Sequence, residues 1–258
     1  MRVEKYVGEL LVNFFEMNVS KIPEREEDGV KTPDFECNYD NGEKYIIEVK
    51  EKNHNPELHA EQEEAFSNNE IFEVISPVEP RAVLEDKIRD GGKQISHYAT
   101  DKKLFRIVWV YFTGIDSYAA FTNMEKAIYG KKLISVLDDP NNVYVKDCYY
   151  FDYSYFYNFK DTVDAVVLSR NSEAKICLNN FSEKYDEIRQ SKFISKFEKG
   201  VIDPIVDVEE NRTFIVDAPI PRKDKEKVFS YLREYYGLKK LGCMYEETYQ
   251  NSFQIPMK

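Results

Sequence analysis

The sequence predicts an α/β protein in which a mixed central sheet is flanked by helices. Residues 32–50 form two short alternating strands around Asn41–Gly42, a dipeptide typical of hairpin turns. Residues 104–113 are almost continuously apolar, as expected for a strand covered on both faces. Residues 2–17 and 81–100 repeat apolar side chains at helical spacing. The predicted order is therefore helix, strand, strand, helix, strand.

The register of the hairpin decides which side chains share a face. A two-residue loop would place Phe35 opposite Glu48 and mix apolar with charged residues. A three-residue loop, Asp40–Gly42 with Gly42 left-handed and a bulge, pairs Phe35 with Ile47 and Asp34 with Glu48. We predict the second register, because it keeps one face apolar. It also places two carboxylates about 5 Å apart at Cβ, close enough to share a cation.

Composition limits the classes of protein that need to be considered. The 258 residues fit one large domain, and a 42% hydrophobic content provides a core. The net charge of −11 argues against a broad nucleic-acid-coating surface, although local basic groups are compatible with it. No pair among the four cysteines has zinc-type C-x-x-C spacing. The sequence shows no leader and no apolar run of membrane-spanning length, so we expect a cytoplasmic protein without membrane contact.

Pro33–Asp34 followed by Glu48–Val49–Lys50 resembles the PD-(D/E)XK nuclease superfamily. The resemblance implies a restriction-endonuclease-like αβββαβ core with C-terminal α/β elaborations. It also implies a single nuclease-like domain over residues 1–258, with the core at about 1–118 and the elaboration at about 119–258. One core strand is not assigned by the hairpin and the apolar strand. We place it in residues 19–31, which otherwise read as a polar loop, or expect it to be short.

The activity that the resemblance implies is cleavage of phosphodiester bonds with Mg²⁺, or with Mn²⁺ in its place. Asp34 and Glu48 supply carboxylate oxygens to the metal, and the carbonyl of Val49 adds another. Lys50, on the same face as Glu48, holds the attacking water or stabilises the charge that develops on the phosphoryl group. These are ordinary residues of a charged strand face if the resemblance is fortuitous.

Two helices are expected to contribute to the same site. Glu9 is the candidate for an additional acid from the first helix, with Glu4 as the alternative. Gln94 and Tyr98 resemble the Q-x-x-x-Y signature of RecB-like nucleases and share a helix face, so both are expected to point toward the site. Gly91–Gly92 in this helix indicates either a break or a close backbone approach.

The remaining segments are assigned from local patterns. Residues 51–73 are acidic and are interpreted as an insertion, helical around 57–66. A capping box at Thr122–Glu125 predicts a helix start. The second half is expected to alternate strands and helices: strands at 142–151, 162–169, 175–178 and 213–217, and helices at 183–198 and 223–236.

Two functions are compatible with these residues. The first is a metal-dependent nuclease acting on DNA, in restriction or phage defence, either as a homodimer or with an operon-encoded protein partner. The alternative is a nuclease-fold protein with a degenerate site that binds nucleic acid or serves as a scaffold. Substrate contacts are expected from two basic clusters: Lys192, Lys196 and Lys199, and Arg222, Lys223, Lys225 and Lys227.

Overall fold

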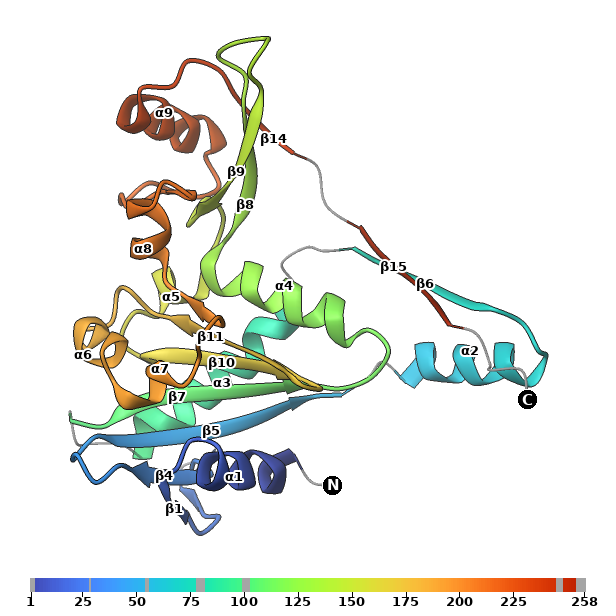
Figure 1. Cartoon of the computed structure of the whole chain (residues 1–258), viewed down its shortest axis with the longest axis vertical. Helices are drawn as coiled ribbons and strands as arrows, with labels where there is room; N and C mark the ends of the chain where they lie inside the picture. Colours follow the sequence, from blue (N-terminus) through green and yellow to red (C-terminus); the bar gives the residue numbers. More distant parts are fainter. Residues whose placement is uncertain are drawn as a thin grey trace.

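A computed structural model of the chain describes residues 3–27, 29–53, 56–77, 82–98, 103–244 and 248–253. Within these residues the largest sheet has seven strands in the order β1–β4–β5–β7–β10–β11–β12 (Figure 1). Strands β4, β5 and β1 are antiparallel neighbours, whereas β5, β7 and β10 run parallel. The predicted α/β architecture with a mixed sheet is confirmed. The strands are β1 (Asn18–Lys21), β4 (Phe35–Asn38), β5 (Lys44–Lys52), β7 (Phe105–Phe112), β10 (Ala165–Arg170), β11 (Glu173–Leu178) and β12 (Val201–Ile202).

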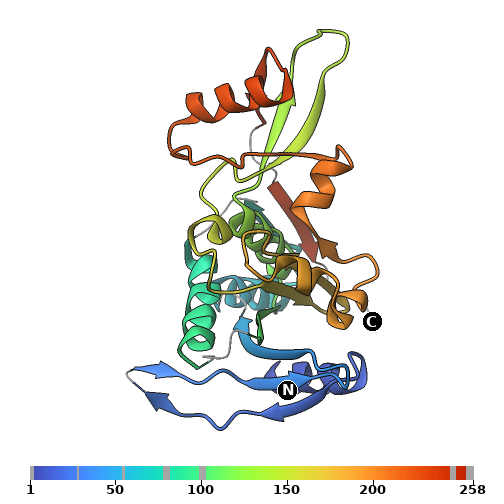
Figure 2. The ribbon, with the colours of Figure 1, turned by 90° about the vertical axis from the view of Figure 1, so that its left-hand side faces the viewer.

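Helices cover both faces of this sheet (Figures 1 and 2). On one face, α1 (Val3–Asn13), α6 (Tyr185–Arg189) and α7 (Lys192–Ser195) pack on one hydrophobic cluster. On the other face, α3 (Ala82–Tyr98) and α4 (Ser117–Tyr129) belong to a second cluster. The expected helix over 81–100 is thus present, and residues 81, 99 and 100 lie outside the described residues. No helix in the described part of the chain is long and apolar enough to cross a membrane.

A second sheet, with the order β13–β9–β8–β14 among the described residues, stands beside the first. Its side chains share the core of α3 and β7, because Phe214 and Ile134 belong to the same cluster as Ile88 and Val108. Strand β10, which follows residue 118, pairs with β7, so no structural boundary divides the first sheet there. The elements of this region are β8 (Lys132–Val136), β9 (Tyr144–Tyr149), β13 (Thr213–Ile215), β14 (Leu241–Cys243), α5 (Tyr155–Asn158), α8 (Pro204–Glu209) and α9 (Lys225–Tyr236).

The acidic insertion forms an arm that extends away from the sheets (Figure 1). It consists of α2 (Pro56–Ser67) and of β6 (Phe72–Pro77), which pairs antiparallel with β15 (Thr248–Phe253). The expected helix around 57–66 is confirmed. None of the residues of α2 is buried.

A further strand of the large sheet overlaps the start of residues 19–31, where the sequence prediction allowed for one. Residues 18–21 form β1, which pairs with β4, and a short hairpin of β2 (Glu26–Glu27) and β3 (Val30–Lys31) follows. The expectation of a polar loop over 19–31 is therefore wrong in part. The burial pattern of β1 explains the miss, because its side chains are exposed or half-buried and give no apolar alternation.

Three other expectations about helix ends are corrected. The first helix was expected to run to residue 17 but ends at Asn13. Three residues later Glu16 adopts a positive φ of 58°, and because this residue is not a glycine, the sequence did not indicate the change in backbone direction. The predicted helix start at Thr122–Glu125 is wrong, because α4 already begins at Ser117. The expected helix over 183–198 is two short helices, since the Ser191 side chain caps α7 by accepting a hydrogen bond from the Ile194 N–H.

Candidate active site

The β4–β5 hairpin has the register predicted from the sequence. Phe35 pairs with Ile47, and the Tyr39 N–H donates to the carbonyl of Glu43 across the three-residue loop. Gly42 has a φ of +92°, as the left-handed loop position requires. Phe35 and Ile47 lie in the core under α1. The neighbouring even-numbered positions of β5 therefore face α3, on the other side of the sheet.

Asp34 and Glu48 meet on the α3 face of the sheet. Asp34 Oδ2 accepts a hydrogen bond of 2.8 Å from the Val49 N–H. Burial, and then the negative charge of Asp34, raises the pKa of Glu48 to about 8, although Lys50 acts in the opposite direction. Burial also raises the pKa of Asp34, partly offset by the Val49 hydrogen bond. The predicted convergence of the two carboxylates is confirmed.

Lys50 joins this pair to the helix above it. Its Nζ donates to Glu48 Oε1 at 2.6 Å and also to Gln94 Oε1. Gln94 in turn donates through Nε2 to the carbonyl of Thr32 at 3.3 Å. Thr32, which precedes Pro33–Asp34, was not anticipated as part of the site, because a backbone carbonyl carries no side-chain signal in the sequence. These bonds fix the ammonium group beside the carboxylates.

Gly91 allows α3 to approach the sheet closely enough to make these contacts. A Cβ built at this position would lie 3.0 Å from Val108 Cγ2 and 3.3 Å from Glu48 Cγ. The helix runs unbroken through both glycines. Of the two alternatives raised by Gly91–Gly92, the structure therefore shows the close backbone approach.

Replacing Gly91 by valine is expected to lower the free energy of unfolding by about 1–3 kcal/mol, because the added methyl groups overlap Val108 and Glu48. Urea unfolding monitored by circular dichroism measures the change. Lys93→Val places the same side chain at an exposed position of the helix, and should stay within about 0.5 kcal/mol of the wild type. An unchanged unfolding midpoint for Gly91→Val would contradict the proposed close packing.

The other helix residues predicted for the site, two in α1 and one in α3, differ in how close they lie to the carboxylate pair. Glu4 is among the charges that raise the pKa of Asp34, and it pairs with Lys21 at 3.1 Å. Glu9 instead forms an exposed ion pair with Lys5 at 3.8 Å. Of the two acids weighed for this role, Glu4 is thus the one whose charge acts on the site. Tyr98 is 38% exposed, so the prediction that it points away from solvent is wrong.

The first basic cluster lies on the sheet face opposite the carboxylates. Lys192 and Lys196 both pair with Glu16, at 4.0 and 2.8 Å. Lys192 also lies over the ring of Tyr39, with Nζ 4.6 Å from its centroid. Helix α7, which carries Lys192, belongs to the core under α1. These positions give no support to a role in binding a substrate at Lys50.

The second basic cluster lies beside α9, at the end of the molecule opposite β4 and β5 (Figures 1 and 2). Arg222 donates to the carbonyls of Val216, Ala218 and Ile220, and its guanidinium lies 4.5 Å from the ring centroid of Tyr157. Lys225 and Lys227 pair with Asp152 and Asp224. Arg222 in particular holds the chain around α9, which is a structural role.

The donor atoms at the carboxylate pair fit a hard divalent cation. Glu48 is 3% exposed, and its Oε2 has no hydrogen-bond partner in the structure. Among the described residues no group of three or more His, Cys, Asp and Glu side chains is placed to hold a metal. Mg²⁺ would therefore rely on two carboxylates, with water and substrate oxygens completing its shell. The expected contribution of the Val49 carbonyl stays a prediction.

Comparisons with protein-family models, with curated proteins and with solved structures found no match to this chain. The function must therefore be inferred from the residues of the site and from their geometry.

Proposed function

We propose that this protein is a metal-dependent nuclease that hydrolyses phosphodiester bonds in DNA, in restriction or phage defence. The observation that carries the proposal is the contact of Lys50 with the buried Glu48, next to a second, half-buried carboxylate, Asp34. The order α1–β1–β4–β5–α3–β7 also supports a restriction-endonuclease-like core, with β2, β3, α2 and β6 as insertions.

The chemistry follows from the charges of these side chains. Mg²⁺ bound between Asp34 and Glu48 would polarise the phosphoryl group and acidify a bound water. Lys50 holds a positive charge beside the scissile phosphate and stabilises the negative charge of the transition state. Its side chain is 19% exposed, whereas that of Glu48 is nearly buried, so the phosphate approaches from the Lys50 side.

Gln94 is a positioning residue. Its amide oxygen accepts from the Lys50 ammonium group and its amide nitrogen donates to the Thr32 carbonyl, so Gln94 holds the ammonium group, which also donates to Glu48, in a fixed position. A flexible lysine side chain that is fixed in this way loses less conformational entropy in the reaction.

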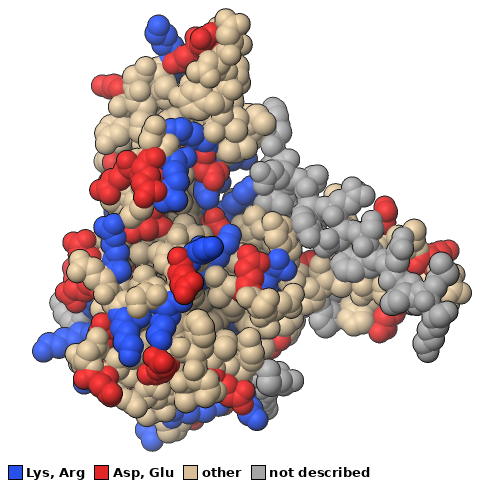
Figure 3. Space-filling view, in the orientation of Figure 1, with Lys and Arg blue, Asp and Glu red and all other residues tan. Residues whose placement is uncertain are grey.

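One observation favours the alternative of a binding or scaffolding protein with an inactive site. The face drawn in Figure 3 carries lysine, arginine and acidic side chains interspersed, without a continuous basic surface for DNA. A nucleic acid bound to this face would therefore make few phosphate contacts, and its affinity would depend weakly on salt.

A cleavage assay distinguishes the two functions. The wild type and Asp34→Ala are incubated with linear duplex, circular duplex, single-stranded DNA and RNA, with Mg²⁺, with Mn²⁺ or with EDTA. We expect cleavage of DNA by the wild type that stops with EDTA and is lost in Asp34→Ala. Absence of metal-dependent cleavage on all four substrates would refute the nuclease and leave the binding function.

A further inference from the structure

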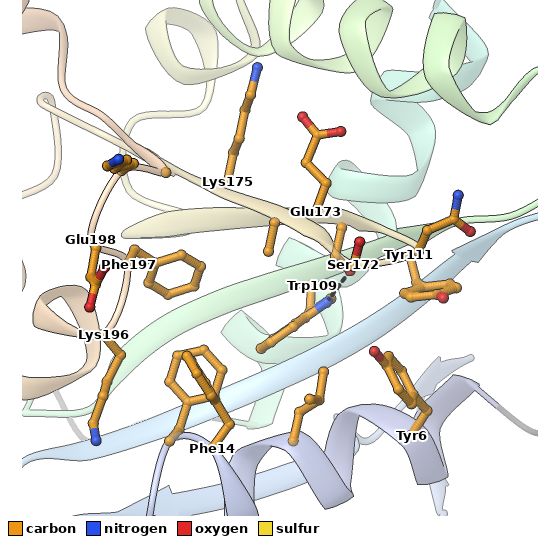
Figure 4. Close-up of a pocket in the computed structure, with 17 residues that line it drawn as sticks. Tyr6, Phe14, Trp109, Tyr111, Ser172, Glu173, Lys175, Lys196, Phe197 and Glu198 are labelled. Atoms are coloured by element: carbon orange, nitrogen blue, oxygen red, sulfur yellow. Dashed lines mark hydrogen bonds between the residues drawn. The ribbon is translucent and has the colours of Figure 1, made fainter.

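A cavity of about 560 Å³ opens on the sheet face opposite the carboxylate pair (Figure 4). It lies between α1, strand β7, the β10–β11 turn and the segment that precedes β12. Its volume is in the range of sites that enclose small organic ligands, about 300–1,000 Å³. It is formed by four separate parts of the chain, so no local sequence pattern indicates it.

Aromatic side chains form the floor and one wall of this cavity. Trp109 and Tyr111 of β7 form the floor, and Tyr6 packs edge-to-face against Tyr111 with ring centroids 5.4 Å apart. Phe14 stands at the opening and is 55% exposed, although it is a large apolar side chain. Phe197 closes the cavity from the side of α7 (Figure 4). Rings on the floor and on the α1 wall favour a flat ligand.

Polar atoms are confined to one edge of the cavity. Ser169 is buried, and its Oγ accepts a 2.7 Å hydrogen bond from the Trp109 Nε1, which leaves its hydroxyl hydrogen to donate. Asn171 and Ser172, in the β10–β11 turn, line the same edge and are exposed. A ligand with hydrogen-bonding atoms around its ring would be matched here.

The charged side chains that line the cavity are three lysines and two glutamates, a net charge of +1. Three of them form ion pairs of 2.8–3.1 Å with residues outside it: Lys196 with Glu16, Glu173 with Arg170, and Lys175 with Glu125. The other two, Glu198 and Lys199, are neighbours of opposite charge. The net charge is small and most of the charged groups are held in ion pairs, so a neutral molecule fits best.

We propose that this cavity binds a neutral, flat heteroaromatic molecule of about the size of a nucleoside. Trp109 and Ser169 are almost fully buried, so the ring lies against the more exposed Phe14 and Tyr111, and its polar edge faces Asn171 and Ser172. The proposal does not depend on nuclease chemistry, because Trp109 belongs to the core under α1, whereas Glu48 faces α3.

Trp109 is the single tryptophan of the chain, so its fluorescence reports on the cavity directly. Adenosine is titrated up to about 1 mM, with excitation at the red edge of the tryptophan band. We expect saturable quenching by adenosine and none by ribose, which lacks the ring. Phe14→Ala should weaken adenosine binding at least about fivefold, the lower limit for loss of a base–aromatic stack.

Val12→Ala is the matched control, because Val12 is 50% exposed on the same helix and does not line this cavity. It should bind adenosine as the wild type does. Absence of saturable quenching, or equal affinity in Phe14→Ala and the wild type, would overturn the site. Adenosine 5′-monophosphate should bind no more tightly than adenosine. An affinity more than about tenfold higher for the monophosphate would overturn the assignment of a neutral ligand.

Discussion

Replacing Lys50 by alanine is expected to lower the rate of DNA cleavage by about 100- to 1,000-fold, the usual cost of removing one group that stabilises the transition state. The affinity for Mg²⁺ should change by less than about tenfold, because lysine is not a metal ligand. In Asp34→Ala both activity and Mg²⁺ affinity should be lost, since half of the carboxylate charge at the ion is removed. Cleavage rates and calorimetric Mg²⁺ titrations on the same preparations measure both effects.

Lys52→Ala is the control for this pair. Lys52 lies two residues further along β5, and its Nζ donates to the Asn53 carbonyl at 2.7 Å rather than to a carboxylate of the site. This variant should cut DNA at the wild-type rate. A Lys50→Ala protein that is as active as Lys52→Ala would remove Lys50 from the site.

The second large effect concerns stability and pH. The pKa of Glu48 is raised from its usual 4.5 to about 8 in the folded protein. The folded chain therefore binds this proton more tightly than the unfolded chain, so stability is complete below pH 4.5 and falls as the pH rises to about 8. At about 1.4 kcal/mol per pKa unit, we expect Glu48→Gln to be about 5 kcal/mol more stable than the wild type above pH 8. Both proteins should be similar near pH 4.5.

Urea unfolding at a series of pH values, in the presence of EDTA, tests this expectation. Glu51→Gln changes an exposed neighbour on β5 and should retain the pH slope of the wild type. Added Mg²⁺ should stabilise the wild type above pH 8 and leave Glu48→Gln almost unaffected, because it has lost a carboxylate. Equal pH slopes in the wild type and Glu48→Gln would show that Glu48 does not carry the effect.

The hairpin could be predicted from sequence because its two faces differ so clearly in polarity. One apolar face and one Asn–Gly turn leave a single register that keeps Phe35 and Ile47 together, and this register brings Asp34 to Glu48. Gln94 was predicted from the resemblance of Gln94–Tyr98 to the Q-x-x-x-Y signature, on a helix that follows the Glu48–Lys50 strand. These signals are local, or separated by a short and readable stretch of chain.

The predictions from sequence failed for features that are determined by contacts between distant parts of the chain. The sequence of the first helix does not decide whether Glu4 or Glu9 acts on the site. Only the packing of α1 against the sheet brings the charge of Glu4 near Asp34. The exposed strand β1 is defined by its pairing with β4 rather than by its own residues. The cavity beside Trp109 needs four chain segments, so composition and periodicity contain no trace of it.

The order of the strands has a consequence for synthesis on the ribosome. Strand β7 lies between β5 and β10, yet β10 begins only at Ala165, long after β7 has ended at Phe112. When β7 has left the ribosome, one of its edges still lacks its partner, and its apolar face is open until α4 and β10 follow. Exposed strand edges of this kind are prone to aggregation. The nascent chain is therefore most prone to aggregation while residues 113–164 are being synthesised, and chaperone binding would protect it most during this interval.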